Sequence, residues 1–278
     1  MRKIRLLPIL GCLTITVYLL VNGCLKPKTA VEDTSFATDH ATTEQSFTDV
    51  QTISDQAASV SNGSLGYRTT ATTGSGCATV THTGDSIIIN FGTSDCMCHD
   101  GRTRRGEIIV TYTGGSYFCN TPGSMHTITF NDFFQDDNKI TGTKTVTYEG
   151  TNSANQPYYN VVINGAVNRA SGGTITASWT RVRTWVTGYD STGVSPIDVY
   201  NITGSGAMTT ANGVLVDVNI PAATPLVVAN DCHWIEAGTV VYTFGGHTRT
   251  LNYGTTPVCD DQATLTLDNG TIKNITLP

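Results

Sequence analysis

Apolar and polar residues alternate with a period of two along most of the chain after Gly66, as they do in strands with one buried face. The alternation is clearest over 214–220 and again over 263–277. In the second stretch Asn269-Gly270 interrupts it, which predicts a hairpin with a type I′ turn. We therefore expect residues 63–278 to form an all-β domain, an antiparallel meander of about a dozen strands folded as a sandwich or an elongated sheet.

Other alternating stretches predict further strands. They are Ser86–Phe91, Glu107–Thr113, His126–Phe130, Thr143–Tyr148, Tyr158–Ile163, Thr174–Val186 and Val240–Phe244, the last followed by a Gly245-Gly246 turn. Several strands begin alike, with a glycine at 106, 142 and 238 and a looser copy at 173, and the unequal spacing indicates a recurring hairpin unit rather than a solenoid. Many strands alternate threonine with apolar residues, which predicts a face that water wets without much charge.

The segment before the strands has a helical pattern. Apolar residues three or four apart follow Thr42 and Thr43, which can act as caps; they are Phe47, Val50, Ile53, Ala57 and Val60. This spacing predicts one short amphipathic helix over 44–62, docked on the domain. Residues 24–43 show no periodicity and are rich in Lys, Pro, Thr and Asp, so we expect a flexible tether.

The N-terminus has the pattern of an export signal over residues 1–23. A basic start is followed by an apolar run, Leu6–Val21, which is shorter than the roughly 20 residues of a membrane span. The run ends in Leu20-Val21-Asn22-Gly23-Cys24, which resembles the lipobox of bacterial lipoproteins. The resemblance implies cleavage before Cys24 and acylation of that residue, and several acyl chains hold a protein stably on a membrane. Leu25, where inner-membrane lipoproteins often carry Asp, favours the outer membrane; an ordinary signal peptide is the alternative.

Composition and charge narrow the functional classes. The chain has 278 residues, 14% of them charged, with 28 glycines and 48 threonines, which argues against a coiled coil and against a charge-rich disordered chain. Removal of residues 1–23 deletes three bases and no acid, so 13 bases face 22 acids and the net charge becomes about −9. A nucleic-acid partner is therefore not expected, because such proteins present a basic surface.

Four short motifs carry a wider resemblance. They are Gly76-Cys77-Ala78-Thr79-Val80-Thr81, Asp100-Gly101-Arg102, Asn201-Ile202-Thr203-Gly204 and Cys232-His233-Trp234-Ile235. From about Asp49 to its end the chain resembles a family of Thr- and Gly-rich secreted lipoproteins of Bacteroidota-type bacteria. The resemblance implies export and anchoring, and it implies no activity.

Six cysteines remain besides Cys12 in the signal and Cys24 at the anchor. An even number in an exported chain predicts disulfides. We expect Cys232 to pair with Cys259, because both lie at the margins of the two C-terminal hairpins. Cys77 and Cys119 are then the partners of Cys96 and Cys98, in an order that the sequence leaves open. The run Cys96-Met97-Cys98-His99 could instead supply metal ligands, but its spacing is too short for a usual zinc site, and we expect no metal and no cofactor.

Candidate chemistry is sparse elsewhere. The mature chain has no nucleophile elbow, metalloprotease helix or phosphate-binding loop. Asp132, Asp136 and Asp137 could offer carboxylates to Ca²⁺ or to acid and base catalysis, yet Asp and Asn also favour turns by bonding their own backbone, and we expect a polar turn.

The strand Thr174–Val186 carries the most suggestive pattern. If it stays regular, Trp179, Arg181, Arg183 and Trp185 share one face. Indoles and guanidiniums stack on sugars or on flat anionic groups, so these four residues are the candidate ligand-binding ladder. The alternative is a structural ladder in which the arginine stems cover the indoles, or a bulge that splits the two Trp residues between faces.

These observations predict a non-enzymatic lipoprotein of the outer membrane that acts in adhesion, glycan binding or envelope architecture. Its expected partners are the membrane, through the lipid, and a glycan or another envelope protein. Two alternatives stay open: a lipid-anchored glycan hydrolase, and a carrier of hydrophobic ligands with an apolar cavity.

Overall fold

The computed structural model describes residues 33–278 except 61–62, 66–76, 114–116, 118–120, 190–194 and 196. Over these residues the chain forms one antiparallel sheet of 16 strands and one helix, α1 (Ser35–Ser59), which confirms the predicted all-β meander preceded by a helix. The strands are β1 (Gly63–Leu65), β2 (Ala78–Thr83), β3 (Ser86–Asn90), β4 (Cys96–Met97), β5 (Thr103–Tyr112), β6 (Met125–Gln135), β7 (Asn138–Thr151), β8 (Pro157–Asn168), β9 (Thr174–Thr187), β10 (Val199–Thr209), β11 (Leu215–Ile220), β12 (Leu226–Ala229), β13 (Thr239–Phe244), β14 (His247–Asn252), β15 (Gln262–Thr266) and β16 (Ile272–Thr276).

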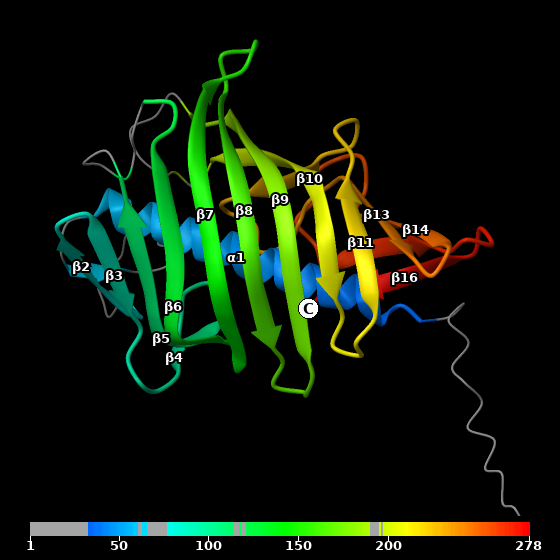
Figure 1. Cartoon of the computed structure of the whole chain (residues 1–278), viewed down its shortest axis with the longest axis horizontal. Coiled ribbons are helices and arrows are strands. Elements are labelled where there is room, and N and C mark those ends of the chain that lie inside the picture. Colours follow the sequence, from blue (N-terminus) through cyan, green and yellow to red (C-terminus); the bar gives the residue numbers. More distant parts are fainter. Residues whose placement is uncertain are drawn as a thin grey trace, which may run out of the picture.

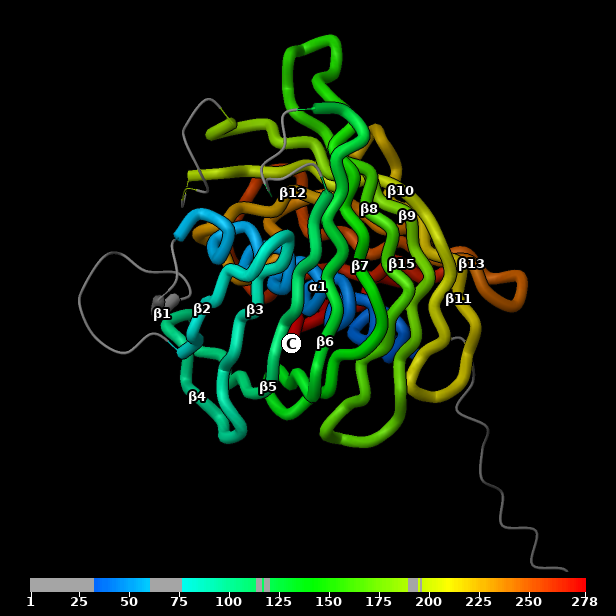
Figure 2. The backbone as a smooth tube through the Cα atoms, turned by 60° about the vertical axis from the view of Figure 1, so that its left-hand side comes forward, coloured from blue at the N-terminus to red at the C-terminus, as the bar shows by residue number. Residues whose placement is uncertain are grey.

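Strands that are neighbours in the sheet are also near neighbours in the chain. The order is β1-β2-β3-β5-β6-β7-β8-β9-β10-β11-β13-β14-β15-β16, with β4 paired to β5 and β12 paired to β10. Pairing between strands that follow one another in the chain is typical of an antiparallel meander. The strands form one continuous sheet that curls around α1, so the helix lies on the concave side of the sheet (Figures 1 and 2).

Helix α1 begins earlier than its apolar spacing predicts. The tether expected over 24–43 is wrong from Ser35 onward, because the helix starts at Ser35, whose N–H donates to Asp33 Oδ1 at 2.9 Å; residues 24–32 lie outside the described residues. The first two turns look like linker in sequence because they are polar. They are helical because the sheet buries and pairs these polar side chains, including Asp39 and His40.

The predicted apolar face of the helix is present. Phe47, Val50, Ile53 and Ala57 are completely buried against the concave side of the sheet, whereas Val60 lies beyond the last helical residue and is 36% exposed. The other faces of α1 are polar yet also mostly buried. A helix that is polar on most sides and still buried needs partners for its polar groups.

The two predicted C-terminal hairpins are confirmed. β13 and β14 pair through the Gly245-Gly246 turn, and β15 pairs with β16. The turn type expected at Asn269-Gly270 was wrong. Of these two residues only Gly270 has a positive φ, of 80°, and the loop Asp268–Gly270 is a three-residue connection closed by Gly270 N–H donating to Leu267 O.

The glycines that begin the recurring strand unit have a common structural reason. Gly142 has a φ of 103°, and a Cβ there would lie 2.3 Å from the carbonyl oxygen of Asn164 on β8. Gly106 is similar, with a φ of 85° and a Cβ that would lie 2.0 Å from Asp132 O on β6. Each position combines left-handed backbone with close approach of the next strand, which only glycine accommodates without strain.

Candidate functional site

The Trp/Arg ladder on β9 faces the interior. Along Thr174–Arg183 burial alternates strictly, and Trp179, Arg181 and Arg183 are 1%, 2% and 9% exposed. The regular strand therefore puts these residues on one face, as expected, but helix α1 covers that face. Trp185 follows at the less buried end, where its ring centroid lies 5.5 Å from that of Tyr200. The ladder is the structural arrangement weighed as the alternative, and it offers no open surface to a ligand.

Arg181 pairs with an acid of the helix. Its Nη2 lies 3.0 Å from Glu44 Oε2, and its guanidinium also lies 4.6 Å from the centroid of the Trp179 ring. Burial raises the pKa of Glu44, but Arg181 and then His40 lower it more strongly, to about 2. His40 bonds the Tyr242 hydroxyl through Nδ1 at 3.0 Å, and burial lowers its pKa, so this histidine stays neutral at neutral pH.

Arg183 belongs to a second cluster near the end of the helix. Its Nη1 lies 3.1 Å from Asp55 Oδ2, and Asp55 Oδ1 accepts hydrogen bonds from Tyr117 Oη at 2.6 Å and Gln51 Nε2 at 2.7 Å. Gln51 also contacts His126 Nε2 at 3.2 Å. Burial lowers the pKa of His126 to about 4.

The two other acids of α1 are paired with the sheet as well. Asp39 Oδ1 lies 2.7 Å from Arg169 Nη1, and Asp49 Oδ2 lies 3.2 Å from Arg102 Nε and 3.8 Å from Arg104 Nη2. Helix α1 contains four acids and neither Lys nor Arg. All its carboxylates therefore pair with arginines of the sheet, which explains how so polar a helix can be buried.

Lys144 on β7 is a further cation under the helix. Its Nζ donates to the backbone oxygen of Phe47 at 2.7 Å, and burial, followed by the charge of Arg183, lowers its pKa to about 7. A cavity of about 20 Å³ lies here between the helix and β7–β10. That volume holds about one water molecule, so α1 itself fills the space that a hydrophobic ligand would need.

The outer face of the central strands has the opposite character. Directly paired residues of β7, β8, β9 and β10 form an array of four rows, which we call the threonine face: Thr141, Ala166, Thr176 and Thr209; Thr143, Asn164, Ser178 and Ala207; Thr145, Val162, Thr180 and Ser205; and Thr147, Asn160, Val182 and Thr203. No member is charged. Neighbouring strands are about 4.8 Å apart, so the hydroxyl, amide and methyl groups are regularly spaced.

The sequence signal for this face was the alternation of threonine with apolar residues. The pattern did not indicate that the four rows would be free of charge, whereas the positions that border them are not: Lys139 pairs with Asn168 in the next row and Asp217 of β11 pairs with Ala207. On the same strands the inner side carries Lys144, Arg181 and Arg183, and on the array itself Ser178 Oγ donates to Asn164 Oδ1 at 2.8 Å.

The candidate carboxylates are all paired, and two of the three lie in a turn. Asp136 and Asp137 form the β6–β7 turn with φ of 48° and 61°, and they pair with Arg102 at 2.6 Å and Arg105 at 2.7 Å. Asp132 lies at an irregularity of β6 and pairs with Lys139 at 2.6 Å. The polar turn that we expected is therefore present at Asp136 and Asp137, whereas Asp132 lies within β6.

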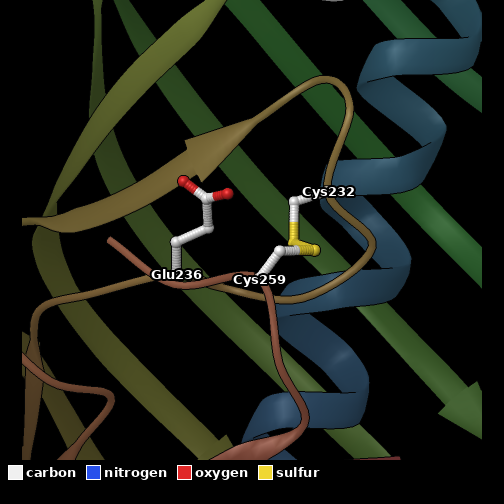
Figure 3. Close-up of side chains that lie close together, drawn as sticks. All are labelled: Cys232, Glu236 and Cys259. Atoms are coloured by element: carbon white, nitrogen blue, oxygen red, sulfur yellow. A yellow bond between two sulfur atoms is a disulfide. The ribbon is translucent and has the colours of Figure 1, made fainter. Parts of the chain in front are cut away.

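The expected Cys232–Cys259 disulfide is present, and Cys77 pairs with Cys96. Among the described residues Cys98 is free and buried, and burial raises its pKa; Cys119 lies outside the described residues. Figure 3 shows Glu236 beside the Cys232–Cys259 disulfide. Each of the three residues has a potential ligand atom, and these atoms lie within 4.8 Å of one another. Because both sulfurs are in the disulfide, no thiolate is left there for a metal.

Within the described part of the chain, α1 lacks the apolar length that would let a helix cross a membrane. No protein-family model matches the sequence. Neither the curated proteins nor the solved structures contain a match. The likeness to secreted Bacteroidota-type lipoproteins therefore stays a prediction.

Proposed function

We propose that this chain is a lipoprotein anchored in the outer membrane through Cys24, and that it acts by binding a partner or building envelope structure rather than by catalysis. The N-terminal run that ends in Gly23-Cys24 supports the anchor. Two disulfides among the described residues suit an exported protein, because such bonds persist in oxidising compartments.

The observation that carries the binding role is the segregation of charge. Glu44 and Asp55 of α1 pair with the arginines of β9 inside, and the four rows of the threonine face outside contain no charged residue, with Lys139 and Asp217 at their borders. Exposed side chains are commonly charged, so an extended uncharged face is informative. Its hydroxyl and amide groups can each donate and accept hydrogen bonds, and its methyl groups add apolar contact.

A neutral polyhydroxylated surface is the partner that this chemistry suits best. Such a partner needs many hydrogen bonds of both kinds and no ion pairs, and a polyanion would find no cation on the threonine face. We therefore assign the face to contact with neutral polysaccharide. Neither alternative function gains an observation, because the carboxylates of Asp132 and Asp136 are held in ion pairs and α1 occupies the interior.

Sedimentation with insoluble polysaccharide tests the binding role. Full-length protein is mixed with cellulose, chitin or starch granules, and wild type is compared with Thr145→Lys/Thr180→Lys. The control is Thr81→Lys, an exposed position on β2 outside the threonine face. We expect wild type and control to co-sediment and the double variant to stay in solution. Failure of wild type to bind any of the three solids, or equal binding by the double variant, overturns the assignment.

Metabolic labelling with palmitate tests the anchor. Wild type should incorporate the label and fractionate with outer membranes, and Cys24→Ser should do neither, because the acylated sulfur is absent. Labelling that survives in Cys24→Ser would contradict the assigned site.

A further inference from the structure

A groove lies along the last three strands, β14, β15 and β16. These strands form the end of the sheet coloured orange and red in Figure 1. Asn252 of β14 pairs with Thr264 of β15, which pairs with Asn274 of β16, so three polar side chains form a row across the floor. Residues Thr256 and Val258 of the β14–β15 connection also line the groove. Its volume is about 430 Å³, within the range of small-molecule sites.

The wall of the groove is held in place without a ligand. Cys259 ties the connection to Cys232, and Val258 N–H donates to Glu236 O at 3.1 Å. At the other end of the connection Gly254 N–H donates to Asn252 Oδ1 at 2.9 Å. This bond uses the amide oxygen of Asn252 and leaves its Nδ2 as a donor. A preformed wall lowers the entropy cost of binding.

The chemistry of the lining selects a neutral ligand. Amides at Asn252, Asn274 and Gln262 and hydroxyls at Thr256 and Thr264 supply donors and acceptors, and no cation lines the groove. The single carboxylate, Asp260, is engaged through Oδ1, which accepts the Gln262 N–H at 2.9 Å. Val258 is 52% exposed and offers an apolar patch beside these polar groups.

We propose that this groove binds one short neutral saccharide, with Asn252, Thr264 and Asn274 bonding its hydroxyls and Val258 packing on its C–H groups. The proposal deepens the proposed function and rests on it, because it adds a discrete sugar site to an extended glycan-contacting face. The two sites lie on different strands, β14–β16 and β7–β10, so substitutions can separate them.

An array of neutral mono- and oligosaccharides of glucose, galactose, mannose and N-acetylglucosamine tests the proposal, with calorimetry on each hit. The groove variant is Thr264→Val/Asn274→Asp, in which side-chain volume is nearly unchanged and both residues lie on the outer surface. A second variant, Val258→Arg, fills the groove from an exposed loop position. The matched control is Thr81→Val on β2, the same chemical change at an exposed position outside both the groove and the threonine face.

We expect wild type and Thr81→Val to bind the same soluble saccharide. Thr264→Val/Asn274→Asp should lose at least about tenfold in affinity, as the loss of two or three hydrogen bonds predicts. Val258→Arg should lose at least as much, because its side chain occupies the groove. Binding lost only in Thr145→Lys/Thr180→Lys would overturn the groove and leave the threonine face standing. If wild type binds no soluble saccharide but still binds cellulose, chitin or starch, the groove is likewise overturned and the threonine face stands. If the groove variants also fail to sediment with cellulose, chitin or starch while Thr145→Lys/Thr180→Lys still sediments, the groove is supported and the threonine face is contradicted.

Discussion

Glu44 of α1 and Arg181 of β9 form an ion pair in the interior of the protein, 3.0 Å apart and almost completely buried. The pair lies 137 residues apart in sequence and joins the helix to the centre of the sheet. Removal of one partner leaves the other charge buried and unpaired, which costs about 3–5 kcal/mol. We expect Glu44→Leu and Arg181→Met each to lower the free energy of unfolding by this amount.

The double variant Glu44→Leu/Arg181→Met should regain most of that loss, because apolar residues of similar size often replace a buried pair at little cost. Urea denaturation of wild type, the two single variants and the double variant gives the coupling energy. Additive losses in the double variant would show that the two residues do not act as a pair.

Lys144 makes stability depend on pH above neutrality. Burial lowers its pKa to about 7 from an ordinary value of 10.5, so the unfolded chain binds the proton more tightly and stability rises with pH through this window. The substitution Lys144→Met removes the effect. We expect Lys144→Met to stabilise the protein more at pH 6 than at pH 9, by about 3 kcal/mol. The difference arises because the pH range from about 7 to 9, about two units, lies between the folded and unfolded pKa values of Lys144. Equal effects of the substitution at both pH values would contradict a buried Lys144.

His126 makes the protein sensitive to acid. Burial lowers its pKa to about 4 from 6.5, so the unfolded state gains the proton first and stability is lost as pH falls through this range. The loss amounts to about 3 kcal/mol. Unfolding curves at pH 7 and pH 4 should show a smaller difference for His126→Gln than for wild type, and the same difference in both proteins would refute this role. His40, whose pKa is also lowered by burial, remains in both proteins and gives the residual acid sensitivity.

The Cys232–Cys259 disulfide should contribute measurably to stability. It joins residues 27 positions apart, and a loop of that length predicts about 3–4 kcal/mol through restriction of the unfolded chain. We expect Cys232→Ser/Cys259→Ser to lose this amount in urea denaturation. Non-reducing peptide mapping of wild type should recover the Cys232–Cys259 and Cys77–Cys96 links, and a different partner for Cys259 would rule out the assignment.

The strands and hairpins could be predicted from sequence because local alternation and glycine turns determine them. The Cys232–Cys259 pair could be predicted because it joins adjacent hairpins. That the Trp179–Arg183 face of β9 is buried could not be predicted from the sequence. A period of two indicates that two faces differ, and charged residues are normally assigned to solvent. Here Arg181 and Arg183 point inward because α1 supplies Glu44 and Asp55, which lie 137 and 128 residues away in sequence.

The start of α1 was hidden for the same reason. Its first turns have the composition of a linker, and their helical structure depends on partners such as Arg169, whose Nη1 pairs with Asp39. The local pattern of apolar residues does not indicate that a helix is stabilised by contacts with another part of the fold. The groove beside Asn252 was likewise invisible, because strand register brings its floor together.

The central claim is that an uncharged outer face recognises a neutral polysaccharide. Binding of the full-length protein to cellulose, chitin or starch granules, and to the polyanion heparin, should be measured at about 0.05 M and about 1 M NaCl, since the higher salt screens exposed charges almost completely. We predict binding to a neutral solid that is unchanged by salt, with no binding to heparin. Binding to heparin alone that disappears at high salt would contradict the claim, because it would assign recognition to charged residues outside the threonine face.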